Sequence, residues 1–350
     1  MTSTHDQTMT RVVVTADRGA TLEQVPVPVP AAGEALVRMT LAGVCGSDTH
    51  ALHGRHPFVP LPYLPGHEVL GVVEGLGEGT TGVRAGDRVV VEPTLPCWTC
   101  KQCTAGRINL CEHLQFFGCG YRQGGMADLF TIPVRRLHVV PDQLDDRQAV
   151  LIEPLSTPVH AARLAGPLAG KAVVILGAGT IGLLLLATVL HHGARRIVVT
   201  DVLEDKRRRA AASGAHAVVD AGRPDLPEAV RAELGESADV VFDCVAIQRT
   251  VDQAVAMALK GGSVVVVGVP VAPVTVPLPQ IQDLQVRIQG SATYLPEDFE
   301  DAIALLVAGA VRPDDIITGT YPLEQVAEAF SASTSGEHVK VVLVAAAAGR

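Results

Sequence analysis

Apolar and polar positions follow different patterns in three zones of the chain. Up to about residue 153, short Val-rich runs are separated by Gly and Pro, which is typical of strands joined by turns and loops. These runs are VVVTA, EALVRM, EVLGVVEGL and GDRVVVEP. The first zone is therefore predicted to form an all-β unit with long loops.

In the second zone, from about residue 156 to 290, fully apolar runs alternate with helical segments. The runs are AVVIL, RIVVT, AVVD, DVVFDC, SVVVVG and VRIQG, and helices are expected from Ile181, from Glu204, near Pro227 and from Arg249. Strands that are apolar on both faces and separated by helices indicate a parallel sheet with helices on both sides. This zone is predicted to be a doubly wound α/β domain.

The uncharged stretch from Ala172 to Leu190 is long enough to cross a bilayer. It divides, however, into a short β-branched run, a glycine turn and a Leu-rich helical run, as a buried strand-turn-helix unit does. We therefore expect no membrane association.

The third zone begins with Pro296-Glu297-Asp298, a favourable start for a helix. It continues as the helical segment FEDAIALLVAG and ends in the apolar run VKVVLV. A helix and a strand are therefore predicted to follow the parallel sheet.

The composition supports a folded protein of two domains and argues against some functions. Of the 350 residues, 48% are hydrophobic and 19% are charged, which allows large cores. The net charge of −9 argues against nucleic acid as a partner, because phosphate neutralisation needs clustered Lys and Arg. The N-terminal MTSTHDQTMTR lacks the apolar segment of a secretory signal, so a cytoplasmic location is expected.

A glycine motif follows the first apolar run of the second zone. Gly177, Gly179 and Gly182 form G-x-G-x-x-G, with Thr180 and Ile181 between the last two. The motif lies between a predicted strand and a predicted helix, which is the setting that indicates dinucleotide binding. The glycines permit a tight turn, close approach of a pyrophosphate, and packing of the helix on the strand, and the helix N-terminus attracts phosphates.

The next apolar run ends at Asp201, about 20 residues further on. A carboxylate at this place accepts hydrogen bonds from both ribose hydroxyls of NAD and repels the 2′-phosphate of NADP. NAD is therefore the predicted cofactor. Arg207 and Arg208 leave NADP open as an alternative, because either guanidinium is able to fold back toward a phosphate.

Residue types that bind zinc occur on separate motifs around the first zone. They are Cys45 in GVCGSDTH, His67 and Glu68 in GHE, and Glu153 in LIEPL. Three such ligands and one open position make a catalytic zinc site, at which the metal lowers the pKa of a bound hydroxyl. Each residue also has an ordinary interpretation. Cys45 would be a small buried thiol, His67 and Glu68 a surface pair, and Glu153 a charge at a helix N-terminus. Their spacing in the sequence does not by itself show that these residues form one site.

Four of the seven cysteines lie in the stretch CWTCKQCTAGRINLC. Cys97, Cys100, Cys103 and Cys111 have the spacing C-x2-C-x2-C-x7-C. Bacterial ferredoxins have a shorter last gap followed by proline, and a thioredoxin-type pair starts a helix in a βαβ unit. Four thiolates around one structural zinc are therefore predicted, with an iron–sulfur cluster or a disulfide as alternatives. Closely spaced cysteines that bind metal also suit a reducing cytosol.

Together and in this order, the motifs GVCGSDTH, GHE, the four-cysteine lobe, EPL and GAGTIG resemble the zinc-dependent medium-chain dehydrogenase/reductase family. The resemblance covers essentially the whole chain and is strongest to the polyol branch, which includes sorbitol and threonine dehydrogenases. It implies a GroES-like β domain formed by residues 1–155 and 293–350. Residues 156–292 would form a Rossmann domain inserted between these segments.

The resemblance also implies roles for single residues. Cys45 and His67 would bind the catalytic zinc, with Glu68 or Glu153 as third ligand, and the four-cysteine lobe would hold a second zinc. Ser47 and His50 match a relay that carries the alcohol proton to water, since a hydroxyl and an imidazole each donate and accept. Asp48 matches a carboxylate that orients the ligand histidine.

The substrate is less defined. Sorbitol dehydrogenases have a Phe-Arg-Tyr run late in the chain, where this sequence has Ala292-Thr293-Tyr294, so Tyr294 is retained and the arginine is not. Tyr121 and Arg122, on a loop before Gly124-Gly125, are predicted to face the substrate, with an ordinary surface loop as the alternative. We expect hydride transfer from a secondary hydroxyl of a polyol, sugar, cyclitol or amino alcohol to NAD.

Other possibilities stay open at this level. A threonine- or aminocyclitol-type dehydrogenase needs an acidic partner for the substrate amine, which the sequence does not identify. A non-catalytic protein similar to lens crystallins of this fold is a remote alternative, against which the intact Cys45, Ser47, His50 and His67 argue. The family implies homodimers or homotetramers, and the last strand of the parallel sheet, VRIQG, suits pairing edge to edge.

Overall fold

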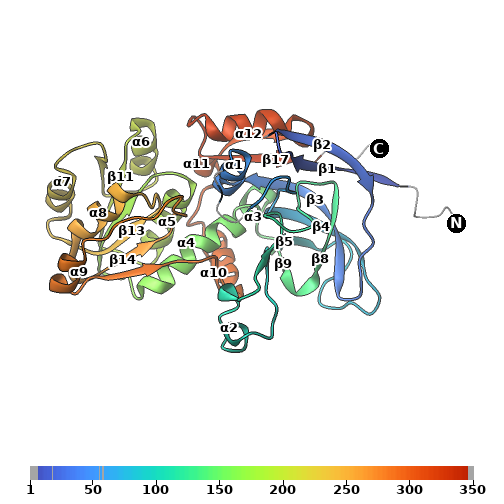
Figure 1. Cartoon of the computed structure of the whole chain (residues 1–350), viewed down its shortest axis with the longest axis horizontal. Helices are drawn as coiled ribbons and strands as arrows, with labels where there is room; N and C mark the ends of the chain where they lie inside the picture. The colour runs from blue at the N-terminus through green and yellow to red at the C-terminus, as the bar shows by residue number, and fades with distance from the viewer. Residues whose placement is uncertain (1–6, 18, 55, 57–58, 346–350) are drawn as a thin grey trace. The chain divides into compact units, whose positions relative to one another are not determined.

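The computed structural model describes residues 7–17, 19–54, 56 and 59–345 of the chain. Its contacts divide the chain into two compact units (Figure 1). The first unit runs through Glu153 and resumes at Ile317, and the second extends from Pro154 to Ile316. The first unit is therefore made of two separate segments of the sequence.

A mixed sheet forms the centre of the first unit. Its strand order is β16-β17-β3-β4-β5-β9, β8 pairs with β3 beside this path, and β1-β2 and β6-β7 form separate antiparallel pairs. The strands are β1 Thr8–Val14, β2 Ala20–Pro26, β3 Glu34–Val44, β4 Glu68–Leu76, β5 Arg88–Val91, β6 Thr94–Leu95, β7 Gln115–Phe116, β8 Leu129–Pro133, β9 Leu137–Val139, β16 Ile317–Pro322 and β17 Lys340–Val344. The helices are α1 Gly46–Leu52, α2 Lys101–Thr104, α3 Asp146–Ala149 and α12 Val326–Thr334.

Alternation along the strands explains the core of this unit. In β3, Ala35, Val37 and Met39 are buried whereas Arg38 between them is exposed, as expected for a strand with one face in the core. Phe330 of α12 and Leu343 of β17 join the same core. The last segment of the chain thus completes the β unit, which the pattern of apolar positions did not reveal.

The second unit contains a parallel sheet with the order β12-β11-β10-β13-β14-β15. Numbered along the sheet's own strands this is 3-2-1-4-5-6, the order of doubly wound dinucleotide-binding folds. The strands are β10 Ala172–Leu176, β11 Arg196–Asp201, β12 Ala217–Asp220, β13 Ala238–Asp243, β14 Ala258–Val266 and β15 Arg287–Gly290. The helices are α4 Ile152–Ala165, α5 Thr180–His191, α6 Glu204–Ala212, α7 Leu226–Leu234, α8 Gln248–Met257, α9 Leu278–Leu284, α10 Pro296–Val307 and α11 Pro313–Ile316.

Every residue of β10 is buried, which agrees with a strand covered by helices on both faces. The apolar runs of the second zone all form strands of this sheet, and the predicted helices begin within one residue of α5, α6, α7 and α8. The uncharged stretch from Ala172 is divided between β10 and α5. In the described part of the chain, no helix is long and apolar enough to cross a membrane.

The second boundary between the units differs from the predicted one. The sequence places residues 293–350 in the first domain, but contacts place residues up to Ile316 in the second unit. The helix α10 is anchored there because Asp298 near its start bonds His160 and Arg163 of α4. The return to the β unit therefore begins with β16.

Candidate metal centres and cofactor site

Three potential metal ligands from two motifs meet in the first unit. The Cys45 sulfur, a ring nitrogen of His67 and a carboxylate oxygen of Glu68 all lie within 4.8 Å of one another. Cys45 directly follows β3, and Glu68 opens β4, which pairs with β3 so that Glu68 lies opposite Gly43. Strand pairing therefore gathers residues that are far apart in the sequence.

Glu68 has a cationic partner from the end of the chain. Nζ of Lys340 lies 2.6 and 2.7 Å from the two carboxylate oxygens of Glu68 and donates to the Val44 carbonyl at 3.2 Å. Both side chains are buried. A Cβ on Gly43 would lie 1.9 Å from Glu68 Oε2, so only glycine leaves room for this carboxylate. Sequence reasoning missed Lys340, whose one signal is a single charge in the apolar run VKVVLV.

His67 lies beside a buried carboxylate of α1. Asp48 Oδ1 is 4.0 Å from His67 Nδ1 and accepts a hydrogen bond from the Tyr63 hydroxyl at 3.1 Å. Its other oxygen accepts the Cys45 N–H at 3.0 Å. His67 Nδ1 is buried and has no hydrogen-bond partner among the described residues. Asp48 is thus held in place from two sides, where it is suited to orient the imidazole of a metal ligand.

The surroundings of this cluster favour a cation. Burial by itself lowers the pKa of His67, but the charges of Cys45 and Asp48 outweigh it and raise the pKa well above its usual value. Burial likewise lowers the pKa of Lys340, and the charges of Glu68 and Cys45 more than offset this. A largely buried, negatively charged cluster with sulfur, imidazole and carboxylate donors fits Zn²⁺.

Glu153 takes a different position from Glu68. It lies in the first turn of α4, is 5% exposed, and its charge raises the pKa of both His67 and Lys340. Among the described residues, however, the group of donors that lie within 4.8 Å of one another contains Glu68 and not Glu153. Glu153 therefore adds negative charge near His67 and Lys340, while Glu68 belongs to the cluster itself.

Ser47 and His50 lie three residues apart on α1, which follows Cys45 directly. Residues with this spacing are neighbours on one face of a helix. Ser47 is half-buried and His50 is exposed. The two side chains therefore lie on one face of α1, and their predicted role as a proton relay stays a prediction.

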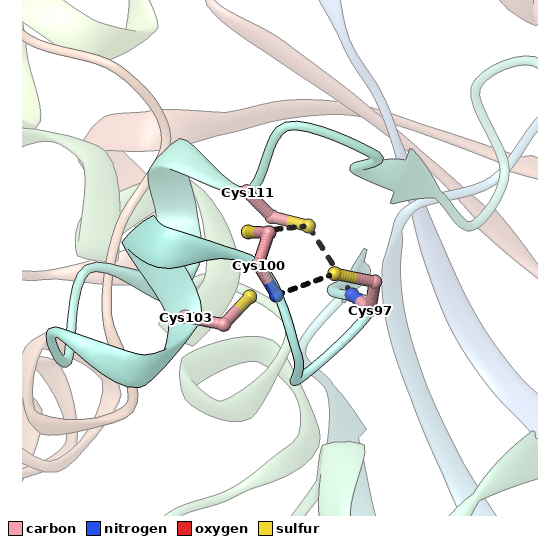
Figure 2. A group of neighbouring side chains, drawn as sticks. All are labelled: Cys97, Cys100, Cys103 and Cys111. Carbon is pink, nitrogen blue, oxygen red and sulfur yellow. Dashed lines mark hydrogen bonds between the residues drawn. The ribbon is translucent and has the colours of Figure 1, made fainter.

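The four clustered cysteines occupy the loop between β6 and β7, which contains α2 (Figure 2). Their sulfur atoms lie within 4.8 Å of one another and point toward a common centre. All four are free thiols. Four sulfur donors and no other ligand in the group match a closed, structural zinc site.

Backbone groups stabilise negative charge on these sulfurs. The N–H groups of Cys97 and His113 donate to Cys111 Sγ at 3.2 and 3.3 Å, and that of Cys100 donates to Cys97 Sγ at 3.3 Å. Hydrogen bonds, first of all from Thr99, lower the pKa of Cys97 to about 6. Burial raises the pKa of Cys103 to about 12, so this thiol would lose its proton only as a metal ion binds.

Of the two loop residues predicted to face the substrate, Tyr121 lies at a surface cavity of the first unit. Tyr121 lines this cavity of about 400 Å³ together with Trp98 and Arg135. Arg122 is 68% exposed on its side chain, and its Nε donates to the Tyr121 hydroxyl at 3.0 Å. Contact of either residue with a substrate stays a prediction.

Tyr294 belongs to the second unit and is 2% exposed. Its ring packs edge to face on Phe299 of α10, with 5.1 Å between the ring centroids. The preceding residue, Thr293, has a positive φ of 49°, which turns the chain sharply before α10. The described contacts of Tyr294 are therefore those of a packing residue, and its predicted role toward a substrate is untested.

The glycine motif forms a turn between β10 and α5. Gly177 has a φ of +96°, which favours glycine, and a Cβ on Gly182 would lie 1.9 Å from the Gly177 carbonyl oxygen. A Cβ on Gly179 would meet no protein atom within 4 Å. Gly177 and Gly182 are thus needed for the turn itself. Gly179 leaves open space at the helix N-terminus, beside Thr180 and Ile181, where phosphates bind in such folds.

Asp201 at the end of β11 is tied to this turn. Its Oδ2 accepts the Ala178 N–H at 2.9 Å, and its Oδ1 accepts the Leu203 N–H at 2.9 Å. Each carboxylate oxygen accepts more than one hydrogen bond, so both keep capacity for ribose hydroxyls. The residues present therefore fit a dinucleotide.

Comparison with known proteins agrees with this arrangement. Residues 31–142 match the alcohol dehydrogenase GroES-like domain, and residues 180–308 match the zinc-binding dehydrogenase domain. The chain is 33% identical over 328 residues to a sorbitol dehydrogenase of Halalkalibacterium halodurans, covering 92% of this chain and 94% of that protein.

Solved structures are similar along nearly the whole chain. A zinc-binding dehydrogenase of Sinorhizobium meliloti bound to NADP has a TM-score of 0.91 and 31% identity, covering 97% of this chain and 100% of its own. An Escherichia coli alcohol dehydrogenase complexed with NADH has a TM-score of 0.90 and 28% identity, covering 96% and 99%.

The chain therefore belongs to the zinc-dependent medium-chain dehydrogenase/reductase family. The predicted fold, a GroES-like β domain combined with a Rossmann domain, is confirmed. So is the prediction of an oxidoreductase that uses zinc and a nicotinamide dinucleotide to act on alcohol groups.

Proposed function

We propose that this protein oxidises a secondary hydroxyl of a polyol, sugar, cyclitol or amino alcohol and passes the hydride to NAD. The observation that carries the proposal is the buried cluster of Cys45, His67 and Glu68, whose donor atoms lie within 4.8 Å of one another. The similarity to a sorbitol dehydrogenase supports a substrate with several hydroxyl groups.

In this proposal Cys45, His67 and Glu68 hold the catalytic zinc. When bound, the metal supplies a Lewis acid that lowers the pKa of a substrate hydroxyl. Asp48 orients His67, and Glu153 contributes negative charge that favours the cation. Ser47 and His50 carry the hydroxyl proton toward water along α1.

The four cysteines of the lobe hold a second, structural zinc, which gives two zinc ions per chain. A zinc site of four free thiols persists in a reducing compartment, and this supports the cytoplasm as the location. Metal analysis of the purified protein is expected to give about two zinc ions per chain. A protein with a single zinc and full activity contradicts this assignment.

The test of the function is a panel of polyols, cyclitols, amino alcohols and simple secondary alcohols with NAD, followed by NADH absorbance. Turnover of polyols is expected to exceed that of simple alcohols. A preference for amino alcohols points instead to a threonine- or aminocyclitol-type dehydrogenase. Absence of turnover across the panel contradicts the proposal and favours a non-catalytic dinucleotide-binding protein.

Cys45→Ser is the matched variant for this panel, because Cys45 belongs to the cluster in the first unit and the glycine motif lies in the second. The variant is expected to lose turnover and keep its affinity for NADH. Unchanged turnover in Cys45→Ser removes this cluster from the chemistry.

We also infer that the protein forms homodimers or homotetramers through β15. This strand lies at the edge of the parallel sheet, and its burial pattern is largely exposed. An unpaired strand edge is a template for pairing with another chain. Light scattering behind a sizing column gives the assembly size, and a monomer contradicts the inference.

A further inference from the structure

The acid at the end of β11 has a second acid beside it. Asp201 and Asp220 are register partners at the carboxyl ends of the neighbouring parallel strands β11 and β12. Asp220 is 48% exposed on its side chain, and its Oδ1 accepts the Gly222 N–H at 2.8 Å. The carboxyl ends of these strands are where a doubly wound fold receives the adenosine half of a dinucleotide.

Arg207 of α6 is held between these two residues. Its Nη1 donates to the backbone carbonyl of Asp201 at 2.9 Å and lies 3.5 Å from Asp220 Oδ1. The Arg207 side chain is 18% exposed, so most of its surface is already covered by protein. The guanidinium is therefore engaged by the protein itself.

The neighbouring arginines are also engaged, but differently. Arg208 is 69% exposed and pairs with Asp205 on its own helix, and Arg223 pairs with Asp225 at 2.7 Å. Neither of these two ion pairs includes a residue at the end of β11 or β12. Arg207 is thus the guanidinium that sits at the end of β11, the place where an arginine accommodates a 2′-phosphate in NADP-binding folds.

We propose that Asp220 is a second residue that makes this protein select NAD over NADP. Its carboxylate keeps Arg207 on the Asp201 carbonyl, so the guanidinium does not turn toward a 2′-phosphate. Its negative charge adds to that of Asp201 at the carboxyl ends of β11 and β12, and both charges repel a 2′-phosphate. The inference rests on the proposed dinucleotide site and extends it by naming what decides the cofactor.

The test is equilibrium titration with NADH and with NADPH, followed by nicotinamide fluorescence. Asp220→Asn is expected to tighten NADPH binding about fivefold to tenfold, the scale of one charge-assisted hydrogen bond. Its affinity for NADH is expected to change less than about twofold, because Asp201 stays in place. Asp205→Asn, which releases the exposed Arg208, is the control and is expected to change neither affinity.

The double variant Asp220→Asn/Arg207→Ala attributes the effect. Loss of the gain in NADPH affinity supports the restraint of Arg207, and retention of the gain overturns it. An unchanged ratio of NADH to NADPH affinity in Asp220→Asn overturns the proposal while leaving the dinucleotide site intact. If the wild-type protein binds neither nucleotide, the proposed function fails as well. If Asp220→Asn does not fold, Arg207→Ala tests the restraint by itself. A restrained Arg207 does not contact the 2′-phosphate, so the variant is expected to keep its NADPH affinity, and a loss of that affinity overturns the proposal.

Discussion

Lys340 and Glu68 form a buried ion pair in which the ammonium nitrogen lies 2.6 and 2.7 Å from the two carboxylate oxygens. The two residues come from β17 and β4, which both pair with β3. Glu68 reaches across β3 because Gly43, opposite it, has no side chain. The last strand of the chain thus supplies the counter-charge for a member of the candidate metal cluster.

Lys340→Met is expected to destabilise the first unit by about 3 kcal/mol, because it leaves the buried Glu68 carboxylate without its cation. Urea unfolding of the wild type and the variant measures this change. Lys340→Arg, which keeps the charge, is the control and is expected to lose less stability.

A double variant separates the ion pair from simple packing. When Glu68→Gln is added to Lys340→Met, the uncompensated charge disappears, and part of the lost stability is expected to return. If the loss of stability in the double variant equals the sum of the losses in the two single variants, a direct interaction between Lys340 and Glu68 is contradicted.

Gly43→Ala tests the room that this pair needs. The new Cβ would lie 1.9 Å from Glu68 Oε2, so the carboxylate has to leave its place between Lys340 and the cluster. We expect a loss of about 1–3 kcal/mol in stability together with a lower zinc content. The matched control is Gly75→Ala, a strand glycine of β4 whose Cβ would meet nothing within 4 Å. Equal effects of the two substitutions would show that the clash is not the cause.

Removal of the metal from the four-cysteine lobe has a built-in optical signal. Trp98 is the single tryptophan of the chain, lies between Cys97 and Cys100, and stacks on Arg135 with 4.3 Å between guanidinium carbon and ring centroid. A chelator strong enough to remove structural zinc is expected to change the intensity and wavelength of tryptophan emission, because the loop loses its crosslink.

Cys103→Ser is expected to reproduce this emission change without chelator, since one of the four sulfur donors is lost. Cys244→Ser, in the second unit, is the control and is expected to keep the wild-type emission. An emission spectrum that stays constant while zinc is released contradicts the role of the metal in holding the loop.

The pattern of apolar residues predicted the strands and helices whose formation depends on residues close together in the sequence. The all-apolar runs of the second zone form the strands of the parallel sheet, since burial on both faces leaves no polar positions. A helix N-terminus at Glu153 is only an alternative interpretation of the sequence, and α4 begins beside it, at Ile152, although it contains Pro154 and Pro158. The proline at 154 falls in the first turn, where it is tolerated, and the helix continues through Pro158.

Long-range pairing explains what the sequence did not reveal at the site. The residue types and motifs identified Cys45, His67 and Glu68 as potential ligands, and the family resemblance joined them. Lys340 gains its role only when β17 pairs with β3, and no periodicity reports which strands pair across so much of the chain. The division between the units falls after Ile316 and not at residue 293 for a related reason, because α10 is attached to α4 by contacts distant in sequence.

The attachment of α10 to α4 predicts how stability depends on pH. Asp298 is fully buried and accepts hydrogen bonds from Arg163 Nε at 2.8 Å and from the Leu295 N–H at 2.7 Å, while His160 Nδ1 lies 2.8 Å from its Oδ2. Burial by itself raises the pKa of Asp298, but the hydrogen bonds, first of all with His160, outweigh it and lower the pKa below its usual value.

A carboxyl group whose pKa is lower in the folded state stabilises the fold above its unfolded pKa, and this contribution is lost as the pH falls through the folded pKa. Asp298→Asn is therefore expected to cost about 2–4 kcal/mol at neutral pH, with the full difference kept down to about pH 5. Below the unfolded pKa of about 4 this contribution declines as the pH approaches the lower folded pKa, so the difference from the variant is expected to shrink. Urea unfolding of both proteins across this range measures it, with Asp301→Asn, an exposed partner of Arg163, as control. A difference that grows toward acid pH, or an equal loss in Asp301→Asn, contradicts the assignment of this stability to the ionised Asp298.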